Sequence, residues 1–339
     1  MALRFIQVGL GNWGSRWLQD LRESNLDLEV VACVDRNSEA LQVAQATHNI
    51  APERCFTSLE EALDTVDTDV VLIVTNLPSH VAFALLALER GKHVLMEKPF
   101  AQTLAEAWKV VGAAEQQERV FMISQTYRYF PAARAVAELV QGGRLGAVGA
   151  VNIDFRRPLS QETRNHHIWQ PLLANISVHH FDLMRMVLGR EPHQMLCYSW
   201  NPVWSKFAEP PCAAATITFD GGAVVNYLGS IVSTGPTTNW AGEWRMECEG
   251  GEIAWTCRGD TSSADEVIIR PFGREPYAIE LPVFPHTDRA GALQAFVQAV
   301  RTGEEPECSG RNNLGTVALM VAAVESAASH RPILVTTNS

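Results

Sequence analysis

The stretch that decides the fold of the first part of this chain is residues 4–14, which read RFIQVGLGNWG. Its first five residues predict a short buried strand, and a helical pattern begins at Trp13. Between strand and helix, Gly9, Gly11 and Gly14 have the spacing G-x-G-x-x-G. A strand, a glycine-rich turn and a helix in this order predict a dinucleotide-binding loop.

Each glycine of this loop has a separate expected task. Gly9 permits the tight turn, Gly11 lets a pyrophosphate approach the backbone, and Gly14 lets the helix pack closely against the strand. The N-terminus of the helix offers the phosphates its free N–H groups and the positive end of its dipole. Asn12 and Trp13 complete the loop. We therefore expect all five residues to contact the cofactor.

The residue that would select the cofactor is Asp35, at the end of the second predicted strand, residues 28–34. A carboxylate at this position binds the ribose hydroxyls and repels a 2′-phosphate, so it favours NAD over NADP. Arg36 follows directly and leaves alternatives open. Its guanidinium would pair with a 2′-phosphate, stack on the adenine, or remain a solvated group at the end of the strand.

The rest of residues 1–125 alternates apolar runs with helical patterns. The further predicted strands lie at 70–74, 93–96 and 120–123, and the predicted helices at 38–47, 59–63, 79–90 and 104–118. Continuous apolar strands that alternate with helices are typical of a parallel sheet covered on both faces. Right-handed crossovers then predict a doubly wound Rossmann domain, an α/β fold, over residues 1–125.

The pattern changes near residue 125, and residues 126–339 predict a second, α+β domain for substrate binding and oligomerisation. A helix at 132–141 precedes several strand-like runs between 147 and 270, which Gly and Pro residues separate. We expect these runs to form an antiparallel meander. One helix at about 171–188 would interrupt it, and two helices would close the chain.

The composition excludes several classes of function. The 339 residues include 47% hydrophobic ones and carry a formal net charge of -11. So acidic a chain is not expected to bind nucleic acid or an anionic membrane. No basic leader with a long apolar core precedes the first strand, so we expect a cytoplasmic protein. The seven cysteines include no C-x-x-C pair, and we expect reduced thiols and no metal.

A candidate catalytic group follows the strand at 93–96, which runs straight into Glu97-Lys98-Pro99. A lysine at the carboxyl edge of a parallel sheet can donate a hydrogen bond to a substrate oxygen, and burial lowers its pKa. Thr75 and His80 follow the strand at 70–74. His80 would contact the cofactor or cap its helix.

The order of these motifs resembles that of the glucose–fructose oxidoreductase/inositol dehydrogenase (Gfo/Idh/MocA) family. Residues 125–131 (QTYRYFP) and 175–182 (NISVHHFD), with Ser309-Gly310, extend the resemblance over nearly the whole chain. It implies oxidation or reduction of a carbon of a sugar, polyol or related ring with NAD or NADP. It also implies a second domain built on a large open, mostly antiparallel sheet, and a cis Lys98–Pro99 bond.

The resemblance assigns roles residue by residue. Lys98 matches the catalytic lysine, and His179 matches the histidine of a D-x-x-x-H-x-x-D pattern, commonly the general acid/base. Asp182 matches the final acid; it would orient the imidazole, cap its helix or pair with Arg185. Asn175 departs from the pattern, because the usual residue is aspartate. An amide cannot take up a proton or carry charge, which argues against a full lysine–aspartate–histidine relay.

Two further side chains are candidates for the substrate site, together with Lys98, Asn175, His179 and Asp182. Arg128 would clamp the substrate or form a structural salt bridge. Trp169 lies in the loop before the catalytic helix, where an indole would stack on a sugar face or fill a core. At the carboxyl edge of the first domain, the expected cofactor contacts are Thr75, His80, Glu97 and Lys98.

The resulting hypothesis is an NAD(P)-dependent dehydrogenase of a carbohydrate, polyol or cyclitol. A second hypothesis keeps the dinucleotide but makes the reaction redox-neutral, such as glycoside cleavage by elimination; a third is a non-catalytic sensor of dinucleotide or sugar. An apolar, tryptophan-bearing sheet face without helices would favour association. The family resemblance likewise implies sheets paired face to face. We therefore expect a homodimer or homotetramer.

Overall fold

A computed structural model describes residues 2–159, 166–259 and 264–338. The chain divides into two compact units. The first unit contains Met1–Thr126 and His286–Leu314, and the second contains Tyr127–Pro285 and Gly315–Asn338. We expected all residues after 125 to form the second domain. Residues 286–314 instead belong with the first unit, because the chain returns to it before its last helix.

The first unit is built on a six-stranded parallel sheet with the order β3-β2-β1-β4-β5-β6. This is the doubly wound order of a Rossmann domain, as the sequence predicted. The two-residue strand β3 was not predicted, because it is too short to show a pattern. The strands are β1 Leu3–Val8, β2 Leu28–Val34, β3 Cys55–Phe56, β4 Val70–Ile73, β5 His93–Met96 and β6 Phe121–Ile123.

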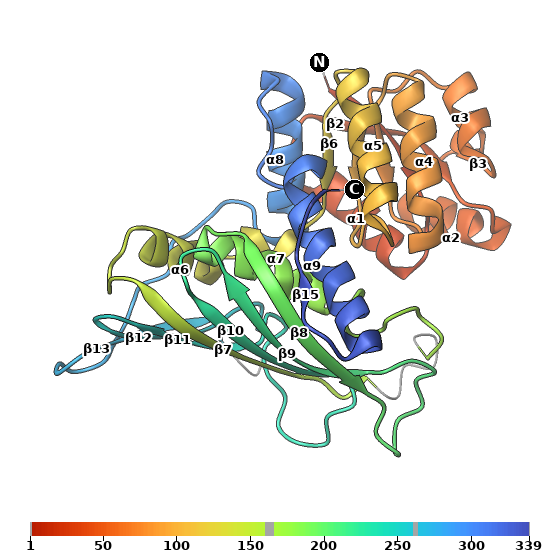
Figure 1. The fold of residues 1–339 in the computed structure, drawn as a ribbon. Coiled ribbons are helices and arrows are strands. Elements are labelled where there is room, and N and C mark those ends of the chain that lie inside the picture. Colours follow the sequence, from red (N-terminus) through yellow and green to blue (C-terminus); the bar gives the residue numbers. More distant parts are fainter. Residues whose placement is uncertain (1, 160–165, 260–263, 339) are drawn as a thin grey trace. The chain divides into compact units, whose positions relative to one another are not determined.

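Helices cover both faces of this sheet (Figure 1). One layer contains α3, α4 and α5, and α1 packs against α2 and α8. Side-chain caps explain several helix starts: Thr103 and Glu106 form a capping box at α5, and Ser58 caps α3. The bounds are α1 Asn12–Glu23, α2 Ser38–His48, α3 Leu59–Thr65, α4 Leu77–Glu89, α5 Leu104–Gln116 and α8 Asp288–Thr302, with 3₁₀ turns at Pro52–Arg54 and Thr126–Tyr129.

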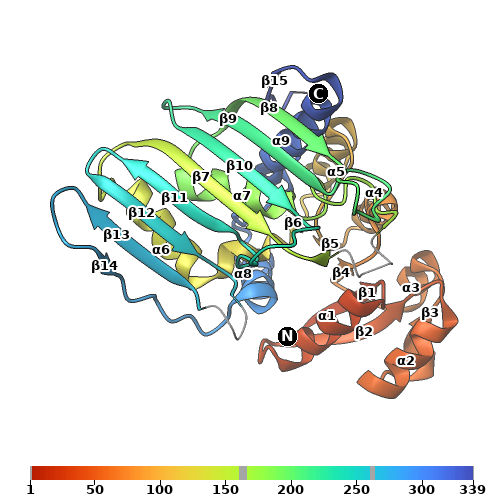
Figure 2. The ribbon, with the colours of Figure 1, turned by 90° about the horizontal axis from the view of Figure 1, so that it is seen from below.

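The second unit is built on a nine-stranded sheet with the order β14-β13-β12-β11-β7-β10-β9-β8-β15 (Figure 2). Most neighbours are antiparallel, as predicted, but β7 and β10 pair in parallel at the centre. Two meanders therefore flank β7, rather than one continuous meander. The strands are β7 Val148–Arg156, β8 Pro192–Trp200, β9 Cys212–Phe219, β10 Val224–Ser230, β11 Glu243–Cys248, β12 Gly251–Thr256, β13 Glu266–Pro271, β14 Tyr277–Ala278 and β15 Ile333–Leu334.

One face of this sheet is covered by α6 Pro131–Gln141, α7 Ser177–Leu188 and the part of α9 (Gly310–Ser329) that belongs to the unit (Figure 2). We expected α7 to begin near residue 171. The backbone instead forms turns there, in which the Asn175 and Ser177 N–H groups donate to carbonyls five residues back. This wider turn interrupts the α-helical pattern, so the regular helix begins only at Ser177.

The open face of the sheet matches our expectation of an apolar, tryptophan-bearing surface only in part: Trp200 on β8 is exposed, but two other tryptophans are not. Trp244 and Trp255 are paired across β11 and β12 and are buried on the helix-covered side. On the β11–β13 side, the open face carries the ion pairs of Glu252 with Arg245 and Arg270. On the β10, β9 and β8 side, it carries exposed apolar groups, among them Tyr198, Trp200 and Leu228. Association through this face remains a prediction.

No helix in the described residues is long and apolar enough to cross a membrane.

Candidate functional site

Four strands of the first unit end in register, and this row defines its carboxyl edge. Val34, Val8, Ile73 and Met96 are successive partners across β2, β1, β4 and β5. The residues that follow them in the chain therefore lie along the same edge of the sheet. Those residues are Asp35, Gly9, Thr75 and Glu97-Lys98, which the sequence singled out separately.

The glycine loop has the geometry that a pyrophosphate requires. Gly9 has a φ of 94°, and a Cβ on it would lie 2.3 Å from the Val74 carbonyl oxygen. A Cβ on Gly14 would lie 2.1 Å from the Gly9 carbonyl oxygen, so helix and strand touch there. A Cβ on Gly11 meets nothing within 4 Å. The backbone at Gly11 thus leaves the space that a phosphate group needs at the N-terminus of α1.

Side chains around the loop support the same assignment. The Gln7 amide donates hydrogen bonds to the Gly9 and Gly14 carbonyl oxygens, which fixes the turn from within. Asn12 and Trp13 are exposed beside it, and the Arg289 guanidinium lies 5.3 Å from the centre of the Trp13 ring. Sequence reasoning missed Arg289, because it lies 276 positions after Trp13 in the chain and only the return of α8 brings the two together.

Asp35 is half-buried and oriented by two main-chain donors. Its Oδ2 accepts from the Leu10 N–H at 2.8 Å, and its Oδ1 accepts from the Asn37 N–H at 2.9 Å. A carboxylate oxygen has two acceptor positions, so both oxygens can still accept a ribose hydroxyl. Arg36 is exposed at the same strand end. The residues present therefore fit a dinucleotide with free ribose hydroxyls.

Two single substitutions in the glycine loop are expected to distinguish NADH binding from folding stability. Gly11→Ala should fold like the wild type, because its Cβ meets open space, but should weaken NADH binding at least about tenfold, or ~1.4 kcal/mol. Gly14→Ala should lower the free energy of unfolding by about 1–3 kcal/mol, because its Cβ overlaps the Gly9 carbonyl. Fluorescence titration with NADH and thermal denaturation measure the two effects. Unchanged NADH affinity in Gly11→Ala would exclude a phosphate at this position.

Hydrogen bonds to the buried Glu97 carboxylate fix the segment that carries Lys98. The Glu97 carboxylate is buried and accepts from the Trp17 indole N–H at 2.8 Å and from the Lys98 main-chain N–H at 3.2 Å. Burial raises the pKa of Glu97, and the Lys98 ammonium opposes this shift. Lys98 itself is half-buried, and the Lys98–Pro99 bond is cis, as predicted. The Glu97 carboxylate thus supports the lysine segment, and a contact of Glu97 with the cofactor stays a prediction.

His80 differs from its predicted role. Its side chain is 1% exposed, with Nδ1 2.9 Å from the Pro99 carbonyl oxygen and Nε2 3.0 Å from the Thr75 carbonyl oxygen. Both ring nitrogens therefore face main-chain atoms of the protein rather than a ligand. Desolvation by burial lowers the pKa of His80. The Thr75 side chain accepts a hydrogen bond from Ser79, which orders the same turn.

In the second unit, His179 lies on α7 and is stacked on a tyrosine. The His179 and Tyr127 rings are parallel within 1°, with centroids 4.1 Å apart. The Arg258 guanidinium lies 4.7 Å from the centre of the Tyr127 ring and donates to its hydroxyl at 2.8 Å. The stack holds the imidazole plane in one orientation. Tyr127 stands beside Arg128 in the sequence, but its pattern gave no indication of this contact.

Asp182 and Arg128 are paired with each other. Arg128 Nε and Nη2 donate to the two Asp182 oxygens at 2.6 and 2.7 Å, and Thr316 donates to the same carboxylate at 2.9 Å. The two side chains are 6% and 1% exposed. They form a structural salt bridge, so neither is available as the predicted substrate contact. Arg185, the alternative partner of Asp182, pairs instead with Glu191.

A second buried network lies behind His179. The His180 Nε2 faces the Trp240 carbonyl oxygen at 2.9 Å, so this nitrogen carries the proton. Its Nδ1 then accepts from the Tyr227 hydroxyl at 3.0 Å, and Tyr227 accepts from Ser177 at 2.9 Å. Burial lowers the pKa of His180 to about 4, which keeps it neutral. Of the adjacent histidines, His180 is therefore structural.

The remaining candidates for the substrate site, Asn175 and Trp169, precede α7. Both are half-buried in the turns of this segment. Within the residues that the structure describes, no three His, Cys, Asp or Glu side chains are grouped to hold a metal. The described cysteines are free thiols.

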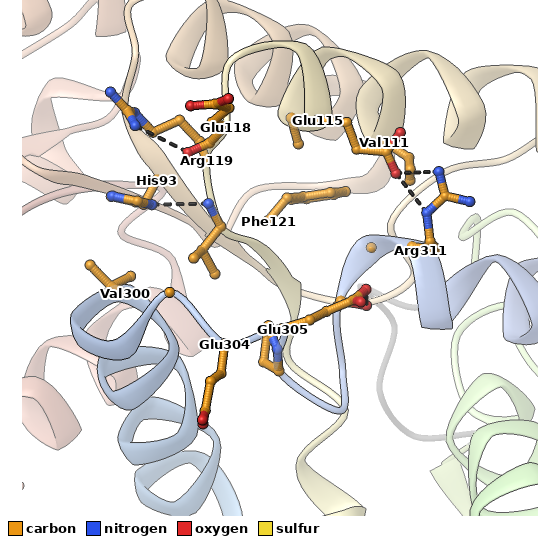
Figure 3. A pocket seen from close by; sticks show the side chains of 16 residues that line it. His93, Val111, Glu115, Glu118, Arg119, Phe121, Val300, Glu304, Glu305 and Arg311 are labelled. Atoms are coloured by element: carbon orange, nitrogen blue, oxygen red, sulfur yellow. Dashed lines mark hydrogen bonds and ion pairs between the residues drawn. The ribbon is translucent and has the colours of Figure 1, made fainter.

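A hollow of about 590 Å³ lies in the first unit, at the edge of the sheet where β5 and β6 begin (Figure 3). Several of its polar groups are bonded within the protein: Arg311 pairs with Glu115, and Glu305 accepts from the Ser309 hydroxyl. His93 accepts from the Val120 N–H at the same edge. We assign no ligand to this hollow.

Known proteins share both parts of this architecture. The description "Oxidoreductase family, NAD-binding Rossmann fold" matches residues 3–125, and "Oxidoreductase family, C-terminal alpha/beta domain" matches residues 137–335. The chain is 27% identical to the uncharacterized protein y4oX of Sinorhizobium fredii, over 99% of this chain and 96% of that protein. It is 27% identical to D-apiose dehydrogenase of Paraburkholderia graminis, over 96% of this chain and 88% of that protein.

The fold also matches a crystal structure of an oxidoreductase from Agrobacterium radiobacter in complex with NAD⁺, L-tartaric acid and magnesium. The TM-score is 0.87, the sequence identity is 19%, and the match covers 99% of each chain. The glycine loop, the row of strand ends at the carboxyl edge and the two family matches agree with one another. This chain belongs to the Gfo/Idh/MocA oxidoreductase family and has its NAD-binding Rossmann domain.

Proposed function

We propose that this protein is an NAD-dependent oxidoreductase that acts on a CH–OH carbon of a sugar, polyol or cyclitol. The observation that carries the proposal is the row of strand ends at the carboxyl edge. Gly9, Asp35 and Lys98 follow three strands whose last residues are in register. The glycine loop and Asp35 would hold a dinucleotide at this edge of the sheet, which also carries Lys98.

The chemistry divides between two side chains. Lys98 donates a hydrogen bond to the substrate oxygen and stabilises the negative charge that develops on it. His179 takes the hydroxyl proton during oxidation and returns it during reduction. When bound, the dinucleotide supplies the nicotinamide C4 position that accepts or gives the hydride. The stack of His179 on Tyr127 supports this role, because it fixes the orientation of the imidazole plane.

The carbohydrate class is supported by the similarity to D-apiose dehydrogenase at 27% identity. Trp169 adds a half-buried indole before α7, and an aromatic face of this kind packs well on the C–H face of a sugar ring. We infer that Trp169 and Asn175 contact the substrate. Asn175 donates or accepts hydrogen bonds but cannot act as an acid or base.

A screen of sugars, polyols and cyclitols with NAD and NADP, followed at 340 nm, tests the proposal. We expect turnover with NAD to exceed turnover with NADP, because the Asp35 carboxylate repels a 2′-phosphate. A preference for NADP would assign the adjacent exposed Arg36 to that phosphate instead. No turnover with any member of the three compound classes would contradict the proposed function.

The amide at Asn175 keeps one alternative open, a redox-neutral reaction such as elimination at a glycoside. In such a reaction, the dinucleotide is oxidised and reduced within each turnover and stays bound. Purified protein that carries one equivalent of NAD, consumes a glycoside and accumulates no NADH would favour this alternative. Release of one NADH for each substrate oxidised would exclude it.

A further inference from the structure

We propose that His80 is a positioning residue for Lys98, and that it acts through the main chain at Pro99. This inference rests on the proposed role of Lys98. The His80 Nδ1 lies 2.9 Å from the Pro99 carbonyl oxygen, and its side chain is buried in the first unit. Pro99 directly follows the lysine, so the hydrogen bond holds the chain one residue beyond the group that has to be aimed.

The chemistry of the contact defines which nitrogen matters. Carbonyl oxygens only accept hydrogen bonds, and a neutral imidazole carries one N–H donor. Because burial favours the neutral ring, the ring can donate either to the Pro99 carbonyl or to the Thr75 carbonyl. The two contacts are of nearly equal length, 2.9 Å for Nδ1 and 3.0 Å for Nε2. The positioning role requires the proton on Nδ1, where it holds the residue after Lys98, and substitutions distinguish the two nitrogens.

On the N-terminal side of Lys98, hydrogen bonds of Glu97 fix the chain. The Glu97 N–H donates to the Ile73 carbonyl oxygen at 2.9 Å, which continues the pairing of β5 with β4. The Glu97 carboxylate in turn accepts from Trp17 and from the Lys98 N–H. His80 thus completes a support on the C-terminal side of the lysine. Its helix, α4, begins in the turn that carries Thr75, so His80 links the chain after β4 to the chain after β5.

Isosteric substitution distinguishes the two nitrogens. The side-chain amide of Asn places its N–H close to the position of Nδ1, and that of Gln places it close to Nε2. His80→Asn therefore keeps the bond to Pro99, and His80→Gln keeps only the bond to Thr75. His80→Leu removes both bonds while it retains an apolar side chain in the buried position.

Lysine acetylation provides a readout that needs no substrate. The chain has four lysines, Lys92, Lys98, Lys109 and Lys206, and mass spectrometry of peptides resolves the rate at each one. Lys109 and Lys206 are exposed and act as internal references in the same sample. Release of the Pro99 carbonyl should free the half-buried Lys98 and speed its acetylation by a limiting amount of acetic anhydride.

We expect acetylation of Lys98 by acetic anhydride to be at least about threefold faster in His80→Gln and His80→Leu than in the wild type. In His80→Asn, the rate at Lys98 should stay within about twofold of the wild-type rate. The references should not change. Equal rates at Lys98 in all four proteins would overturn the proposal, and so would acceleration of every lysine together with a common loss of thermal stability. If all three variants bind NADH more weakly while the acetylation rate at Lys98 is unchanged, His80 contributes to cofactor binding and does not position Lys98.

The same variants separate this inference from the proposed function. With a substrate from the screen, His80→Gln should lower kcat about tenfold and leave the KM for NAD within twofold, and His80→Asn should recover most of kcat. If no substrate turns over but acetylation follows the expected order, the positioning of Lys98 stands and the dehydrogenase function fails. If substrate turns over and acetylation does not follow that order, only the role of His80 fails.

Discussion

Lys98→Met should abolish turnover while leaving NADH binding nearly intact. The methionine keeps the length of an unbranched side chain but removes the ammonium that donates to the substrate oxygen. Loss of a group that stabilises developing charge or transfers a proton typically lowers kcat about 10²–10⁴-fold. The measurement compares kcat on a substrate from the screen with the Kd for NADH from a fluorescence titration.

Lys109→Met is the matched control for this prediction. Lys109 lies exposed on α5, so its substitution removes a positive charge of the same kind without affecting the carboxyl edge. We expect the control to keep the kcat of the wild type. A Lys98→Met enzyme that keeps most of its activity would show that the reaction does not use this ammonium, and the support by Glu97 and His80 would then be purely structural.

Arg128→Met should destabilise the second unit strongly. It leaves the Asp182 carboxylate, whose side chain is 1% exposed, without its charged partner. Removal of one partner from a buried pair typically costs about 3–5 kcal/mol, because an uncompensated charge stays buried. Urea denaturation followed by circular dichroism measures the free energy of unfolding. The double variant Arg128→Met/Asp182→Asn should recover part of the loss, because it no longer buries a charge.

Arg245→Met provides the comparison with an exposed ion pair. Arg245 pairs with Glu252 on the open face of the sheet, and its side chain is 69% exposed. Water screens such a pair, so its loss should change the free energy of unfolding by less than ~1 kcal/mol. A loss of similarly small size for Arg128→Met would contradict the structural role of the Arg128–Asp182 pair and return both groups to the candidate substrate site.

The first unit was predictable because its signals are local. The glycine loop, Asp35 and the Glu97-Lys98-Pro99 segment each follow an apolar run that forms a strand of its own. Parallel strands end at one edge, so identification of the strands was enough to bring these motifs together. The second sheet was predictable only as a set of short strands. In the second sheet, β7 pairs with β10, 74 residues away in the chain, and with β11, 89 to 100 residues away. No local sequence pattern indicates such pairings.

By itself, the sequence determined the Rossmann domain, its dinucleotide loop and the position of Lys98 at the carboxyl edge, because these depend on residues close together in the chain. Only the tertiary structure decided what the polar side chains contact. Asp182 could have served the imidazole, a helix end or Arg185, and it pairs with Arg128, 54 residues away. The His80 ring and the Glu97 carboxylate likewise form hydrogen bonds to segments that lie far from them in the chain. A buried polar group requires a hydrogen-bond partner, and packing of distant segments determines which partner is within reach.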